Sequence, residues 1–302
     1  KFAKSPDLKD KYTDGMTDLI EKGYAVKVND ANDGDRKWYL PHHPVINPNK
    51  DKIRIVFDSA AKQNGVSLNS MTHQGPDYIN KLAGIIIRFR QERVALMADI
   101  KTMFYQCKVK QDDQDALRFL WWQGGDVSQP PEEYKMTVHI FGGKWSPSVC
   151  GYSVMRTVND FGDGFSDMAK WNITNNMYVD DLLTSVKDIE TASKLAVDVK
   201  ALLQKGGFNI TKWTSNHEEA LSDIPKEDQT QVNAVIFNHD NTQRALGIQW
   251  SQSNDTLGYN SDIDIKKPTK RGMLSMLSSV FDPMGWICPF VLKARFIIQE
   301  LC

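Results

Sequence analysis

Apolar residues recur at two different periods along the chain, and these periods predict its helices and strands. Spacings of three and four predict helices over residues 5–23, 77–90, 146–161 and 188–206, with a final helical region from Pro268 that is interrupted at residues 282–285. Short apolar or alternating runs predict strands at residues 24–28, 38–40, 53–57, 93–98, 107–110, 116–122, 134–141, 173–178, 182–186, 234–237 and 245–250. The central order of strand, helix, strand–turn–strand, helix and strand predicts an α+β fold, an antiparallel sheet with helices on one face.

Composition places the chain among ordinary globular proteins. Its 302 residues, 41% hydrophobic and 25% charged, suit about two structural units and exclude a disordered or collagen-like chain. The longest apolar runs, residues 82–87 and 285–292, fall well short of the roughly 20 residues that cross a bilayer, so we expect no membrane partner. There is no initiator Met or signal-peptide pattern, and the four cysteines are scattered. We therefore interpret the chain as a piece of a longer protein that is not secreted.

Charge is distributed unevenly although the net charge is only −1. Residues 50–110 carry eleven Lys and Arg against five Asp and Glu, and residues 266–302 carry six against two. Residues 111–133, which lie between them, have one Arg and six acids. The two basic regions could form the walls of a cleft for an anionic ligand, or they could be ordinary solvated faces.

The sharpest chemical feature is the pair Asp180 and Asp181, which lies between two short apolar runs. Adjacent carboxylates are a poor choice for a tight turn, because they repel each other and no Gly is present. A broken local rule of this kind often marks a functional site, and a bound Mg²⁺ would relieve the repulsion. The alternative is an exposed acidic turn without a function.

Asp99 ends the apolar run of residues 94–98 and is the second element of a possible site. Alone, it could equally cap a short helical turn. Together with Asp180 and Asp181, it suits a two-metal site for phosphoryl transfer, in which two ions bridge an attacking hydroxyl and a triphosphate.

With these residues in place, the chain resembles the reverse transcriptases of BEL/Pao-type long-terminal-repeat retrotransposons, over roughly residues 39–302. The segments that carry the resemblance are residues 97–101 (MADIK), 103–106 (MFYQ), 141–143 (FGG) before Ser146-Pro147, 178–181 (YVDD), 212–216 (KWTSN), 246–250 (LGIQW) and 270–289 with FDPMG inside. Each segment alone is weak evidence, but the ordered set is specific.

The resemblance implies a right-hand polymerase with an antiparallel palm sheet backed by helices. Residues 1–23 would form an N-terminal helical segment, residues 24–92 and 108–144 the fingers, residues 93–107 and 145–259 the palm, and residues 260–302 the start of a thumb. Asp99, Asp180 and Asp181 match the catalytic triad, and the carbonyl of Ile100 would be a further metal ligand. The implied cofactor is a pair of Mg²⁺ ions, with Mn²⁺ as an alternative.

The resemblance also implies residues that bind the nucleotide and the nucleic acid. Those expected at the incoming nucleotide are Lys52 (or Lys50), Arg54, Asp58, Ile100, Phe104 as a steric gate against a 2′-hydroxyl, Phe141 and Gly142. Lys212 is expected to protonate the pyrophosphate leaving group. Nucleic-acid contacts are expected at Lys144, Tyr178, Gly247, Trp250, Lys266, Lys267, Lys270 and Arg271, although Trp250 also suits a core position. Retroviral enzymes carry Gln where this chain has Phe141, so the hydrogen bond of that Gln to the sugar is absent here.

The expected function is therefore RNA-directed DNA polymerisation in retrotransposon replication. Its partners would be an RNA template, a DNA primer, the RNA–DNA hybrid, deoxynucleoside triphosphates, and the protease, ribonuclease H and integrase of a pol polyprotein. The expected location is a cytoplasmic retrotransposon particle, with the nucleus as an alternative. Two other interpretations stay open: an inactive or domesticated palm that only binds nucleic acid, and an aspartic protease whose loop would be residues 53–60.

Overall fold

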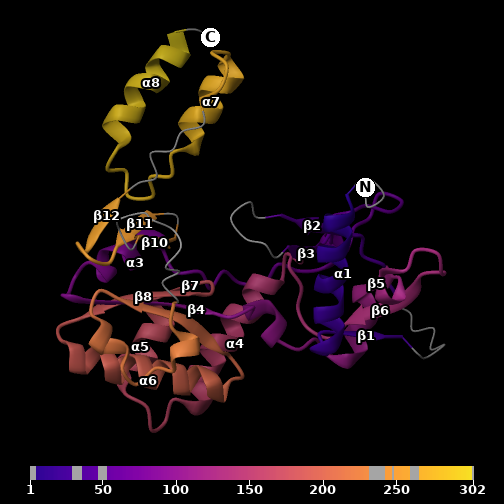
Figure 1. The fold of residues 1–302 in the computed structure, drawn as a ribbon, viewed down its shortest axis with the longest axis horizontal. Coiled ribbons are helices and arrows are strands. Elements are labelled where there is room, and N and C mark those ends of the chain that lie inside the picture. Colours follow the sequence, from indigo (N-terminus) through magenta and orange to yellow (C-terminus); the bar gives the residue numbers. More distant parts are fainter. Residues whose placement is uncertain are drawn as a thin grey trace. The chain divides into compact units, whose positions relative to one another are not determined.

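The chain folds into two compact units. Figure 1 shows the chain coloured along its sequence. Unit 1 consists of residues 1–78 and 102–156, and unit 2 of residues 79–101 and 157–302. The computed structural model describes residues 5–28, 36–46, 53–230, 242–246, 248–258 and 265–300. Within these ranges, a search for a helix with the length and hydropathy of a membrane span finds none.

Unit 1 contains two small antiparallel sheets, with strand orders β1-β6-β5 and β2-β3. Its helices and strands are α1 (Pro6–Glu21), β1 (Ala25–Lys27), β2 (His42–Val45), β3 (Arg54–Phe57), α2 (Leu68–Met71), β5 (Arg118–Trp121), β6 (Glu132–Met136) and most of α4 (Ser146–Phe161), with 3₁₀ helices at Met103–Gln106, Gln111–Leu117 and Gln123–Gly125. Helix α1 begins at a proline, which suits a first helical position, and buries Tyr12, Met16 and Leu19. These side chains join Phe57 and Phe119 in the core of the unit.

Unit 2 is built on a four-stranded antiparallel sheet with strand order β7-β8-β4-β9. Its elements are α3 (Leu82–Phe89), β4 (Val94–Ile100), α5 (Asp167–Asn175), β7 (Met177–Tyr178), β8 (Asp181–Val186), α6 (Ile189–Lys205), β9 (Ile210–Ser215), the three-stranded sheet β10 (Thr242–Ala245), β11 (Ile248–Ser251) and β12 (Thr256–Gly258), α7 (Lys270–Ser279) and α8 (Cys288–Glu300), with 3₁₀ helices at Glu218–Leu221 and Lys226–Asp228.

Helices cover both faces of the four-stranded sheet. Figure 1 shows α5 and α6 along one face and α3 along the other. Helix α6 buries a full apolar stripe, including Leu195, Val199 and Leu203, as its spacing predicts, and Asp188 caps its start through the N–H of Thr191 at 2.8 Å. On the opposite face, Phe89 of α3 joins a separate apolar cluster with the sheet. The prediction of helices on one face only is therefore wrong, whereas the antiparallel order is confirmed.

Several predicted elements have different bounds. Helix α3 begins at Leu82 and not at residue 77, and the side chain of Asn80 instead donates to two backbone carbonyls, those of Thr174 and Met177. The predicted strand over residues 173–178 is helical up to Asn175, because Ser166 caps a helix that the apolar pattern did not reveal. The predicted strand over residues 245–250 is a hairpin that turns at Leu246.

The remaining differences concern short strands. Of the predicted strands at residues 38–40 and 107–110, the structure retains only isolated bridges, Tyr39 to Arg118 and Lys108 to Val138. The strand predicted over residues 134–141 ends at Met136. The strand predicted at residues 234–237 lies outside the described residues. Residues 79–92, predicted with the fingers, lie in unit 2 together with β4.

Candidate active site

Asp99 and Asp181 face each other directly across two paired strands. They are register partners in the β4–β8 ladder, and the N–H of Ile100 donates to the carbonyl of Asp180 at 2.8 Å. This bond pattern makes Asp99 and Asp181 a pair without hydrogen bonds between them, the type in which opposing side chains lie closest. Because like charges opposite each other destabilise a sheet, the pair needs a compensating cation.

The turn that presents Asp180 is strained. Met177 pairs with Leu182 and Tyr178 with Asp181, so Val179 and Asp180 alone connect the two strands. Val179 has φ of 57°, a left-handed conformation that costs a β-branched residue of the order of 1–3 kcal/mol. Two-residue hairpins normally carry Gly at such a position. The strain is local to the predicted catalytic carboxylates, as it is at many functional sites.

Lys212 reaches this carboxylate pair because of an irregularity in β9. Thr211 pairs with Asp99 and Thr214 with Met97, so β9 has one residue more than β4 between these two pairings. Lys212 sits at this bulge with φ of 55°, and its ammonium donates to Oδ2 of Asp99 at 2.7 Å. Bulges beside active sites commonly redirect a side chain in this way.

Negative charge at the site exceeds what Lys212 supplies. Burial and the nearby charges of Asp180 and Asp99 raise the pKa of Asp181 to about 7, while Lys212 acts to lower it. Among the described residues, no three His, Cys, Asp or Glu side chains already form a group arranged to hold a metal ion. The donor set nevertheless fits a hard divalent cation, because it consists of carboxylate oxygens that disfavour one another's ionisation.

A buried polar network fixes the start of the β7–β8 hairpin. The amide of Asn176 donates to Asn172 Oδ1 at 2.7 Å and to Thr184 Oγ1 at 3.1 Å, and its Oδ1 accepts from Arg88 Nε at 2.6 Å. Asn176 is 1% exposed and directly precedes β7. Fully satisfied buried networks fix one local geometry, so this one holds the base of the hairpin in place.

A second group of predicted site residues comes together in unit 1. The guanidinium of Arg54 lies 4.7 Å over the ring of Phe141, and the ring of Phe104 lies 4.8 Å from that of Phe141. Tyr105 meets Phe141 edge-on at 5.4 Å. No carboxylate pairs with Arg54 in the part of the chain that the structure describes, so this stacked cation is free to bind an anionic ligand.

The loop after Phe141 is held close to β3. Gly142 has φ of 112°, and a Cβ there would lie 2.0 Å from the carbonyl oxygen of Phe57. Asn69 Oδ1 accepts the N–H of Lys144 at 3.0 Å, which fixes the far side of the loop. Only Gly allows this close approach of the two backbones.

Asp58 has a structural contact that the prediction did not include. Its Oδ1 accepts the N–H groups of Ala60 and Ala61, each at 3.0 Å, and so shapes its own turn. This turn accounts for the presence of Asp58 in the segment that resembles a protease loop, and it does so without assigning Asp58 a catalytic role.

The other predicted contacts are distributed over unit 2. Tyr178 is half-buried within the hairpin, in β7, whereas Lys266, Lys267, Lys270 and Arg271 are all exposed near the start of α7. Trp250 is 0% exposed, so its ring has no face for a base, and we correct its predicted nucleic-acid contact to a packing role. Lys50, Lys52 and Gly247 lie outside the described residues.

The residues that support the site have no recognisable signal in the sequence. Asn176, Asn80 and Arg88 gave no signal, because isolated Asn and Arg residues carry no periodic pattern. The four-residue spacing of Asn172 and Asn176 becomes informative only once α5 is known to be a helix.

Comparison with solved structures identifies the class of fold. A foamy viral protease-reverse transcriptase in complex with double-stranded DNA covers 90% of this chain and 47% of its own, with a TM-score of 0.59 at 18% identity. The foamy viral enzyme in complex with RNA/DNA hybrid covers 94% of this chain and 32% of its own, with a TM-score of 0.57 at 17% identity. The chain has a mixed α/β fold with antiparallel sheets that resembles retroviral reverse transcriptase structures, and it spans less than half of these chains.

A family model gives a second, shorter match. Residues 269–302 match the model described as Pao retrotransposon-like RNaseH-like domain. No curated protein sequence matches the chain. The family-model match and the structural likeness together support a retroelement pol protein.

Proposed function

We propose that this chain is the reverse transcriptase part of a retroelement pol polyprotein, an RNA-directed DNA polymerase that uses two Mg²⁺ ions. The observation that carries the proposal is the site in unit 2, where Asp99 and Asp181 face each other, a strained turn presents Asp180, and the bulge in β9 directs Lys212 onto Asp99. Under this proposal, the four-stranded sheet is the palm.

The chain's own residues have distinct roles in the proposed reaction. The primer 3′-hydroxyl gives its proton to solvent as its oxygen attacks the α-phosphorus of the nucleotide, and the bond from that phosphorus to the oxygen that bridges it to the β-phosphorus breaks. Asp99, Asp180 and Asp181 would hold the ions, with the backbone carbonyl of Ile100. Bound divalent cations supply charge neutralisation and lower the pKa of the attacking hydroxyl. Lys212 Nζ delivers a proton to the departing pyrophosphate.

Residues of unit 1 are proposed to bind the nucleotide. Arg54 binds the triphosphate from its place over Phe141, and the ring of Phe104 excludes a 2′-hydroxyl. The proposed partners are template RNA, primer DNA and their hybrid. The similar foamy viral structures, which are complexes with DNA and with RNA/DNA hybrid, support this choice.

Residues 269–302 suit a contact with nucleic acid better than a hydrolytic site. The described part, residues 269–300, contains the helices α7 and α8, and its two acids are Asp282 and Glu300. Asp282 accepts the N–H groups of Trp286 at 3.0 Å and Ile287 at 2.9 Å, so it caps the turn before α8. The exposed cations near Lys270 can bind backbone phosphates, as the start of a thumb would.

The test is incorporation of labelled dTTP on poly(rA)/oligo(dT) with Mg²⁺. We expect incorporation by the unchanged chain and its loss in Asp180→Asn, which keeps the size of the side chain but removes its charge. Asp223→Asn is the matched control, because Asp223 is an exposed acid of unit 2 that only accepts from Ser193 at 2.6 Å. We expect this control to retain full incorporation.

Two results would contradict the proposal. Incorporation that persists in Asp180→Asn would place the chemistry elsewhere. No incorporation by the unchanged chain, with binding of the hybrid intact, would favour the alternative of a palm that binds nucleic acid without catalysis.

A further inference from the structure

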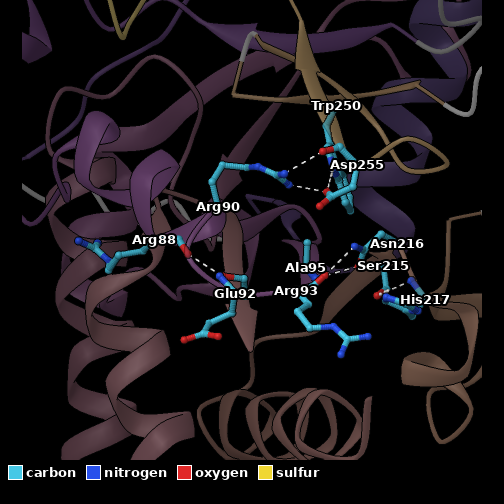
Figure 2. Close-up of polar contacts among 11 residues, drawn as sticks. Arg88, Arg90, Glu92, Arg93, Ala95, Ser215, Asn216, His217, Trp250 and Asp255 are labelled. Carbon is cyan, nitrogen blue, oxygen red and sulfur yellow. Dashed lines mark hydrogen bonds and ion pairs between the residues drawn. The ribbon is translucent and has the colours of Figure 1, made fainter. Parts of the chain in front are cut away.

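The connection between α3 and β4 is fixed to the sheet by the side chains of Ser185 in β8 and of Asn216, which directly follows β9 (Figure 2). The hydroxyl of Ser185 donates to the carbonyl of Arg88 at 2.7 Å and accepts the N–H of Glu92 at 3.0 Å. The side-chain Oδ1 of Asn216 accepts the N–H of Ala95 at 2.8 Å. These bonds satisfy backbone groups on both sides of Arg90, so the base from which its side chain extends is rigid.

The side chain of Arg90 extends from this connection and binds the turn between β11 and β12. Its Nη1 donates to Oδ1 of Asp255, and its Nη2 donates to the backbone carbonyl of Asp255 at 2.7 Å. Trp250 Nε1 donates to the same Oδ1 at 3.0 Å, as Figure 2 shows. Both charged side chains are 31% exposed. One of the two hydrogen bonds is charge-assisted and the other goes to the backbone, so the partly shielded guanidinium fixes both the side chain and the backbone of Asp255.

An apolar anchor lies next to this ion pair. The ring of Trp250 meets that of Phe89 edge-on at 5.0 Å and packs with Ala95 and Leu183 in one buried cluster. Tyr178 and Leu246 pack against the same cluster. The turn that joins β10 to β11 and the hairpin that carries Asp180 therefore pack against the same cluster.

Two left-handed residues lie in the turns that flank β11. Leu246 lies in the turn before the strand with φ of 52°, and Asp255 lies in the turn after it, directly before β12, with φ of 47°. The left-handed conformation is unfavourable for Leu246, whereas Asp adopts it more readily. The Arg90–Asp255 contact fixes the turn after β11, and this four-residue strand connects that turn to the one that contains Leu246.

We infer that Arg90 and Asp255 are positioning residues, which hold the β10–β12 sheet against α3 and so fix the turn at Leu246 beside the catalytic hairpin. The inference rests on the proposed function, because the group to be positioned is the primer end that must reach the carboxylates. Neither residue touches the reacting atoms. Their effect is on where the primer end lies relative to Asp99 and Asp180.

The first test measures amide hydrogen exchange and does not depend on activity. Arg90→Gln removes the charged fork, and Asp255→Asn removes the charge but keeps an oxygen for Trp250. We expect exchange over residues 242–258 to rise by about tenfold in each variant, with β4 and β8 unchanged. The control is the double variant Glu190→Gln and Lys194→Gln. It removes an exposed ion pair on α6, in which a cation and a carboxylate also meet, at 2.6 Å.

The second test measures single-nucleotide incorporation by the same proteins. We expect the maximal rate to fall by about tenfold, because a small displacement of the reacting end is costly, while the KM for the nucleotide stays within about twofold. The double variant should be no slower than the slower single variant, since both changes break one contact.

The outcomes are distinguishable. Unchanged exchange over residues 242–258 overturns the inference whatever the activity. Raised exchange with an unchanged rate, or a raised nucleotide KM at an unchanged rate, overturns the positioning role. No incorporation by the unchanged chain overturns the proposed function and with it the catalytic role, while the exchange result still decides whether the pair fastens the sheet.

Discussion

The ammonium of Lys212 lies 2.7 Å from Oδ2 of Asp99 because β9 has one residue more than β4 at that point. Without the extra residue, regular alternation would apply through this part of β9, and the contact would depend on a different register. The bulge therefore places the Lys212 ammonium on Asp99 and within electrostatic reach of Asp181, while its side chain stays 58% exposed and so accessible to a substrate.

Lys212→Gln should lower the rate of nucleotide incorporation by about 10²-fold, because it removes both the proposed proton donor and the cation beside Asp99. Binding of the primer–template should stay within about twofold, since Lys212 is one of many basic groups. Pre-steady-state incorporation and a binding titration measure the two quantities. Lys194→Gln on α6 serves as the control, and a rate equal to that of the unchanged chain would refute the role of Lys212.

Phe141→Leu should raise the KM for the nucleotide by about fivefold, because a cation–π contact contributes about 1 kcal/mol and its loss frees Arg54. Discrimination against ribonucleotides should also weaken, since Phe104 loses the ring that packs against it at 4.8 Å. Phe141→Tyr keeps the ring and should restore both properties. If the Leu and Tyr variants behaved alike in steady-state kinetics with ribonucleotides and deoxyribonucleotides, the proposed role of the Phe141 ring in supporting Arg54 and Phe104 would be wrong.

Gly142→Ala should destabilise unit 1 by about 2–3 kcal/mol, because the new Cβ would meet the carbonyl of Phe57 and the backbone has positive φ. Gly164→Ala is the matched control, with φ of 92° and no atom within 4 Å of its Cβ position. Urea unfolding separates the two effects. Equal losses in both variants would show that φ alone is responsible and not the close approach of the backbones.

Acid should destabilise the protein through His139. Burial lowers the pKa of His139 from 6.5 to about 4, and its Nδ1 accepts from Trp145 Nε1 at 3.1 Å. The folded state thus favours neutral His139, so the stability that it contributes is present above pH 6.5 and is lost as the pH falls through about 4, by up to about 3 kcal/mol. His139→Gln keeps an acceptor for Trp145 without a titration.

Urea unfolding between pH 7 and 4 checks this prediction. The variant should show a shallower loss of stability over that range than the unchanged protein, and the slope that remains includes the similarly buried His42, whose pKa is also lowered by burial. Parallel curves for the two proteins would exclude His139 as a source of the acid sensitivity.

The sequence predicted the elements whose pattern is local. The stripe of α6 and its cap at Asp188 follow directly from side-chain spacing, and so does the placement of Asp99 at the end of a buried strand. What it could not reveal depends on contacts far along the chain. The contacts of Asn80 keep residues 77–81 out of a helix, although their sequence pattern is helical. Helix α5, which begins after Ser166, has too weak an apolar stripe to be recognised. The contact that fixes the turn after β11 joins Arg90 and Asp255, which are 165 residues apart in the sequence.

The left-handed non-glycine residues of unit 2 have a consequence for how its ligands can be found. Val179, Lys212, Leu246 and Asp255 all have positive φ, and they lie at the carboxylate turn, at the bulge or in the turns that flank β11. Unfavourable backbone energy is thus concentrated where the proposed ligands bind, so this region opens at a lower free-energy cost than the core. A ligand that holds these turns should stabilise the protein through mass action, and the melting temperature would then report occupancy for cations, nucleotides and hybrids without a catalytic assay.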